Sequence, residues 1–98
     1  MVVLLATTEA LKQTRNYCTV EFRDGKDGQF VDVTQVTVGT SMAMEGQPMA
    51  GYVTEPARIG RGRYTVQMVL AMSGTWQITI GWSDAAGPKR ATFTARIS

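Results

Sequence analysis

The sequence predicts an all-β protein with the architecture of an immunoglobulin-like antiparallel β-sandwich of about six to seven strands. Three observations support this prediction. Apolar and polar residues alternate along several segments, which is typical of strands with one buried face. No segment has convincing helical spacing of its apolar residues. Ten glycines and three prolines in 98 residues suit a turn-rich fold and exclude a disordered chain.

The N-terminal half predicts a short edge strand followed by two longer strands. Residues 1–7 are mostly apolar and predict the edge strand, whereas residues 8–15 predict a connection. Apolar residues share one parity in the segment 17–23, which predicts the first long strand. In the next strand the apolar parity changes between Val33 and Val36. This change predicts a β-bulge or a strand that passes from one sheet to the other.

The C-terminal third predicts three strands arranged as an antiparallel meander. The alternation is strict in the segments 63–72, 75–82 and 90–98. Ser73 and Gly74 separate the first two segments and match a two-residue hairpin turn. A longer turn containing Gly and Pro separates the last two segments.

One more short strand is expected around residues 51–54. The two tryptophans are expected in different environments, one buried and one partly exposed. Trp76 lies on the apolar parity of its segment and should anchor the core. Trp82 has the same parity but lies near the strand end. We therefore expect Trp82 to be partly exposed and available for contact with a partner.

Composition excludes several function classes. The chain of 98 residues is long enough for one domain, residues 1–98. A net charge of +2 is too small for a nucleic-acid-binding surface. Histidine is absent, which removes the commonest general base and the commonest zinc ligand. No paired carboxylates, phosphate-binding glycine loop or nucleophile elbow is visible, so we expect neither an enzyme nor a small-molecule substrate.

Three other features have ordinary structural explanations. The single cysteine, Cys18, lies on an apolar face, so a buried inert thiol is favoured over a ligand or nucleophile. Asp24 and Asp27 flank glycines in DGKDG and fit turn chemistry better than calcium binding. The basic segment 57–63 is favoured as a solvated loop over an anion site.

The methionines form the candidate functional site. Three of the six, Met42, Met44 and Met49, lie within eight residues. On an extended chain Met42 and Met44 leave the same face about 7 Å apart, and a turn could bring Met49 back towards them. Met72 ends its strand and is expected at the same end of the sandwich, whereas Met68 is expected in the core.

These methionines have three interpretations. Methionine commonly fills irregular gaps, so Met42, Met44 and Met72 could close the end of a small sandwich. Thioether sulfur also binds soft Cu(I), so Met42, Met44, Met49 and Met72 form a candidate metal-ligand pool. A methionine-rich surface for docking a protein is the third interpretation, and it is compatible with copper binding.

The motifs resemble those of the YtkA-like family, to which FixH-type proteins are related. The resemblance rests on the Met-x-Met cluster, on the Gly-x-Tyr opening at residues 62–64 and on MSGTW at residues 72–76. It implies a small extracytoplasmic β-sandwich, often tethered to the outer face of a bacterial membrane and linked to copper handling or to the assembly of copper-containing oxidases. This chain departs from copper-binding relatives in lacking histidine, which disfavours Cu(II) and leaves a thioether site.

Two hypotheses follow. The first is a periplasmic or membrane-anchored accessory domain that captures Cu(I) through methionines and passes it to a protein partner at the outer face of the membrane. The second is a metal-free interaction module that docks a membrane complex or forms a homodimer through an exposed edge strand. The N-terminus has no signal-peptide features, so an exported protein would carry its signal or anchor outside these 98 residues.

Overall fold

The described part of the chain is built from strands. The structure is a computed structural model that describes residues 2–7, 11–44 and 47–97, and the side chains of these ranges except residues 43–49. The strands are β1 (Val2–Thr7), β2 (Arg15–Arg23), β3 (Thr34–Met44), β4 (Gln47–Ala50), β5 (Tyr52–Val53), β6 (Ala57–Gly60), β7 (Arg63–Val69), β8 (Gly74–Asp84) and β9 (Gly87–Ile97). No helix occurs in these ranges, and so none that could span a membrane. The all-β prediction is confirmed.

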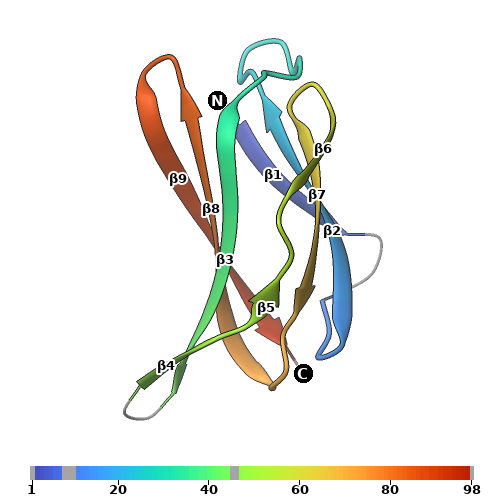
Figure 1. The fold of residues 1–98 in the computed structure, drawn as a ribbon, viewed down its shortest axis with the longest axis vertical. Coiled ribbons are helices and arrows are strands. Elements are labelled where there is room, and N and C mark those ends of the chain that lie inside the picture. The colour runs from blue at the N-terminus through green and yellow to red at the C-terminus, as the bar shows by residue number, and fades with distance from the viewer. Residues whose placement is uncertain (1, 8–10, 45–46, 98) are drawn as a thin grey trace.

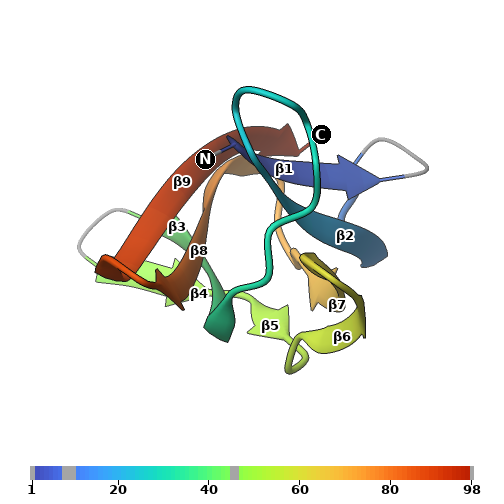
Figure 2. The same ribbon diagram turned by 90° about the horizontal axis from the view of Figure 1, so that it is seen from above.

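The strands form two antiparallel sheets. One has the order β1-β2-β7-β5, with β6 also paired to β7, and the other has the order β4-β3-β8-β9. Figure 1 shows the long strands running along the molecule, and Figure 2 shows the two sheets as separate layers. This arrangement is consistent with the predicted β-sandwich.

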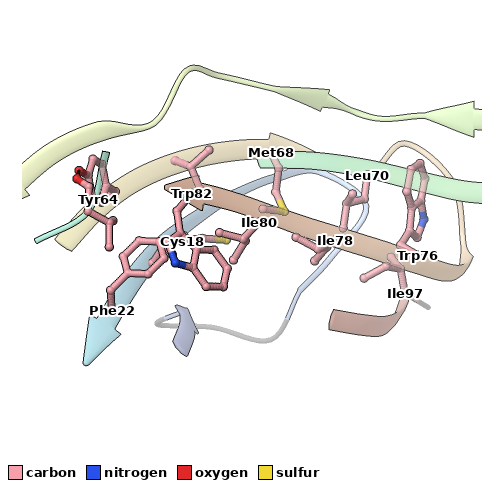
Figure 3. Close-up of a cluster of buried hydrophobic side chains, with 13 residues drawn as sticks. Cys18, Phe22, Tyr64, Met68, Leu70, Trp76, Ile78, Ile80, Trp82 and Ile97 are labelled. Carbon is pink, nitrogen blue, oxygen red and sulfur yellow. Dashed lines mark hydrogen bonds between the residues drawn. The ribbon is translucent and has the colours of Figure 1, made fainter. Parts of the chain in front are cut away.

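The core lies between the sheets and follows the period of two seen in the sequence. Strands β2, β7 and β8 bury every second residue against the opposite sheet. In the core close-up Trp76 lies at one end of the buried cluster, and Trp82 lies between Phe22 and Ile80 towards the other end (Figure 3). Both are buried, so the expectation of a partly exposed Trp82 was wrong. Trp82 points inward, as its position in the alternation of β8 indicates, although it lies near the end of the strand. Its ring packs against Phe22 with the ring centroids 5.3 Å apart.

The parity change in β3 is a bulge, as the sequence predicted. Its pairing with β8 shifts register between Thr34 and Thr37. Gln35, within the bulge, has a positive φ of 53°, which is uncommon for a residue with a side chain. Val36, within the bulge, and Val38, beyond it, both pack against the core.

The predicted C-terminal meander was wrong at its first turn. β7 and β8 belong to different sheets, so residues 70–73 cross from one layer to the other, and only β8 and β9 form a hairpin. The alternation continues through Leu70, which is buried beyond the end of β7. Because a Ser-Gly pair suits a corner between sheets as well as a hairpin, local sequence did not distinguish them.

The region from 47 to 60 holds three short strands where one was expected. β4 pairs with β3, whereas β5 and β6 pair with β7 in the other sheet. The chain therefore changes layers again at Gly51, between β4 and β5. The crossings at Gly51 and at residues 70–73 both lie towards the lower end of Figure 1.

Candidate methionine site

The methionine positions gather around Trp76. In the register of β3 with β8, Met42 lies opposite Trp76, and in the register of β3 with β4 it lies opposite Met49. Residues directly opposed in an antiparallel pair have neighbouring Cβ atoms, about 4.5–5.5 Å apart. The topology therefore places positions 42 and 49 side by side at the end of the sandwich that Trp76 closes.

Met42 reaches from β3 to the start of β8. Its side chain is half-buried and packs against the core. A Cβ atom placed on Gly74 would meet the Met42 Cε atom and would lie 3.4 Å from the Sδ atom. Gly74 has a φ of 136°, a conformation that favours glycine. The thioether of Met42 thus lies against the connection that carries Met72.

Met72 is fixed at this end through its backbone. Its carbonyl oxygen accepts a hydrogen bond of 2.9 Å from the indole Nε1 atom of Trp76. The Met72 side chain is 38% exposed. Met72 is therefore held near Trp76 and is partly exposed to solvent.

The other methionines divide into two groups. The backbones of Met44 and Met49 belong to β3 and β4, and their side chains lie outside the described part. Met68 is fully buried in the core, as predicted. The structure thus brings Met42 and the Met72 segment together, adds position 49 by register, and separates Met68 from them.

Gly51 also shapes this end, and it was not singled out from the sequence. The backbone N–H of Gly51 donates to the Thr40 hydroxyl at 3.1 Å. A Cβ atom on Gly51 would lie 2.6 Å from that hydroxyl, 2.8 Å from the Val69 carbonyl oxygen and 3.3 Å from the Trp76 ring. The available signal was a glycine inside an apolar segment, which often marks a close backbone approach.

The donor chemistry at this end suits a soft monovalent cation. Two described side chains present thioether sulfur, and the chain has no histidine. Within the described ranges no group of three or more His, Cys, Asp or Glu side chains could hold a metal ion. Thioethers favour Cu(I) over Zn²⁺, Ca²⁺ or Cu(II), which prefer imidazole, thiolate or oxygen ligands.

Cys18 and the aspartates occupy the environments expected of them. Cys18 is buried, and desolvation raises the pKa of its thiol from an ordinary value of 9.0. Such a thiol is a poor nucleophile at neutral pH. The carboxylates of Asp24 and Asp27 accept backbone hydrogen bonds from Lys26 at 2.7 Å and Gln29 at 2.9 Å, which is turn chemistry.

The basic segment makes surface ion pairs. Arg58 pairs with Asp32 at 3.3 Å, and Arg63 lies 3.7 Å from a Glu21 oxygen. Both arginine side chains are substantially exposed. These arginine side chains are solvated as expected, but the expectation of a loop was wrong, because residues 57–60 form β6 and Arg63 begins β7.

The motif at residues 62–64 has a structural role. Gly62 has a φ of 66°, and a Cβ atom there would lie 2.9 Å from the Phe22 carbonyl oxygen. Tyr64 donates its hydroxyl proton to the Val33 carbonyl oxygen at 3.0 Å. Together they fasten the loop before β3 to the start of β7.

The motif at residues 72–76 builds the crossing between the sheets through the Trp76–Met72 hydrogen bond and the positive φ of Gly74.

A sequence profile of the YtkA-like family matches residues 2–81. The chain belongs to the YtkA-like family. No curated protein matches the sequence. In this YtkA-like domain the matched region runs from β1 into β8, so it includes strands of both sheets and the methionine site but not β9.

Proposed function

We propose that this YtkA-like domain is a non-enzymatic, extracytoplasmic accessory domain that takes up Cu(I) as cargo through methionine sulfur. Met42 and Met72 are the proposed ligands whose side chains the structure describes, and Met44 and Met49 are the two further proposed ligands. The observation that supports this most directly is the contact between the Met42 thioether and Gly74, two residues after Met72. It places the Met42 thioether against a residue close in the chain to Met72, although Met42 and Met72 are 30 positions apart in the sequence.

The exposure of the two described methionines suits a transfer site. Met42 is half-buried, whereas Met72 is among the exposed large hydrophobic residues. Thioethers have no acidic proton to lose, and their binding to Cu(I) does not require a reduced thiol. An open ligand allows a partner protein to enter the coordination sphere before the inner ligand is released.

The family supports the same proposal. Resemblance to YtkA-like and FixH-like proteins implies copper handling at the outer face of a bacterial membrane. A partner there would be a copper-requiring membrane complex or a second copper carrier. The absence of histidine distinguishes this chain as one suited to Cu(I) alone.

An anaerobic competition titration tests this proposal. Cu(I) is held by a chromophoric chelator, and its transfer to the domain is followed by loss of colour. We expect one ion per chain, with affinity at least about tenfold weaker, or about 1.4 kcal/mol, in a Met42→Leu/Met44→Leu variant and in Met72→Leu. Met68→Leu is the matched control, because Met68 is buried in the core and should leave the affinity unchanged.

Two results would contradict the proposal. One is a wild-type domain that removes no copper from the chelator. The other is equal copper affinity in the wild-type domain and in the variants at Met42, Met44 and Met72. The first result would favour the metal-free interaction module, whereas the second would place copper binding at other residues.

A further inference from the structure

The sheet edges of this domain are protected unequally. In the described part of the chain the two sheets end at β1, at β5 with β6, at β4 and at β9. An open edge can pair with another strand, and proteins usually block it with charge, proline or an interruption. The four edges differ in whether they carry such features.

Three edges are blocked. β9 carries the exposed cations Lys89, Arg90 and Arg96. β4 contains Pro48, which lacks a backbone donor. The edge beyond β7 is interrupted between β5 and β6 by residues 54–56, and the β6 register also shifts.

β1 lacks all of these features. Its sequence VVLLAT has no charge and no proline. It pairs with β2 in one continuous register from Val2 opposite Arg23 to Thr7 opposite Cys18. On its outer face Val2 is 42% exposed and Leu4 is 41% exposed. β1 is therefore a regular, uncharged strand with apolar residues on both faces, and no strand of the described ranges pairs with the side of β1 that faces away from β2.

We infer that β1 pairs with β1 of a second copy of this chain, in antiparallel orientation about a two-fold axis at Leu4. That register places Leu4 opposite Leu4 of the second copy, Val3 opposite Leu5 and Val2 opposite Ala6. Every pair named here is apolar, and the exposed side chains of Val2 and Leu4 from the two copies form one continuous apolar stripe on the outer face of the joined sheet. The two sheets containing β1 join into one continuous sheet across the dimer.

The apolar sequence of β1 is complementary to itself in this register, which favours a second copy as the occupant, and no charge beside β1 opposes the pairing. The nearest acidic residue on the same face, Glu21, lies opposite Leu4 on β2 and pairs with Arg23 at 3.0 Å. In the dimer the two Glu21 positions are three strand spacings apart, or about 14 Å, which exceeds the Debye length of about 8 Å. Pairing through β9 would instead bring the cations of two copies together. The pairing of β1 does not involve the methionines.

Oligomeric state tests this inference. Sedimentation velocity of the wild-type domain, with a copper chelator present, should show a shift from a mass of 10.7 kDa to twice that value as concentration rises from micromolar to millimolar. Leu4→Lys should weaken the dimer at least about tenfold, because two lysines would face each other at the axis. Leu4→Glu should weaken it similarly, and an equimolar mixture of the two variants should dimerise again.

Thr94→Lys, an exposed substitution on β9, is the matched control and should leave dimerisation unchanged. Three results would overturn the inference. They are a wild-type domain that stays monomeric throughout, a dimer insensitive to both Leu4 variants, and loss of the dimer in Thr94→Lys. Failure of the lysine and glutamate variants to pair when mixed would also contradict it, since recovery depends on the two Leu4 positions facing each other.

Discussion

The indole nitrogen of Trp76 donates a 2.9 Å hydrogen bond to the carbonyl oxygen of Met72. This bond spans the corner where the chain leaves one sheet and enters the other. The Trp76 ring is fully buried below it, so one side chain both closes the core and fixes the segment that carries Met72. The candidate metal site and the fold therefore depend on the same residue.

Trp76→Phe should destabilise the domain more than Trp82→Phe. Both changes leave a cavity in the core, but only the first removes a hydrogen bond, whereas the Trp82 Nε1 atom is buried without a partner in the described part. Removing an unpaired donor offsets part of the cavity cost. We expect a loss of about 2–4 kcal/mol for Trp76→Phe and at least about 1 kcal/mol less for Trp82→Phe.

Urea unfolding of both tryptophan variants measures this difference. A larger loss for Trp82→Phe would show that the bond to Met72 does not stabilise the corner. An equal loss would lead to the same conclusion.

Gly51→Ala should be one of the costliest small substitutions in the domain. The added methyl group would lie 2.8 Å from the Val69 carbonyl oxygen and 3.3 Å from the Trp76 ring. Because the Val69 oxygen belongs to the backbone, relieving this clash would require the backbone of the sheet to move. We expect a loss of at least about 2 kcal/mol in the free energy of unfolding. Gly39→Ala is the control, because no atom lies within 4 Å of the added group, and it should change stability by less than about 1 kcal/mol. Similar thermal unfolding midpoints for the two variants would refute the close approach at Gly51.

The buried thiol of Cys18 predicts a pH dependence of stability. Burial raises the pKa of Cys18 above 9.0, so the thiol of the unfolded chain ionises first as pH rises. The stabilising contribution is complete below about pH 9 and is lost as pH rises towards the folded pKa, by up to about 1.4 kcal/mol per pH unit. Cys18→Val removes this contribution and keeps an apolar side chain of similar size.

The corresponding measurement is the difference in free energy of unfolding between the wild-type domain and Cys18→Val, from about pH 8 to about pH 10. It should shift in favour of the variant as pH rises. A difference that is constant over this range would mean that the thiol is not desolvated in the folded state.

The sequence predicted the strands better than their connections. Alternation located β2, β7, β8 and β9 and assigned Trp76 and Met68 to the core, because a period of two requires one buried face. It did not distinguish a hairpin from a crossing at Ser73, since both need the same local turn chemistry. The inward position of Trp82 was missed because a strand end was given more weight than its parity.

The candidate site was predicted in part. Sequence spacing grouped Met42, Met44 and Met49, and proximity to a turn added Met72. The link between Met42 and Gly74 depends on the pairing of β3 with β8, a contact between distant segments that local patterns do not contain.

The central claim is that methionine sulfur at the Trp76 end binds Cu(I), and methyl NMR tests it most directly. The domain is labelled with carbon-13 at its methionine methyl groups and titrated anaerobically with Cu(I) up to one equivalent. The account predicts that the methyl signals of Met42 and Met72, joined by Met44 or Met49, shift and saturate together while the Met68 signal stays in place. Signals of Met42 and Met72 that do not move, in a domain that remains folded, would contradict it.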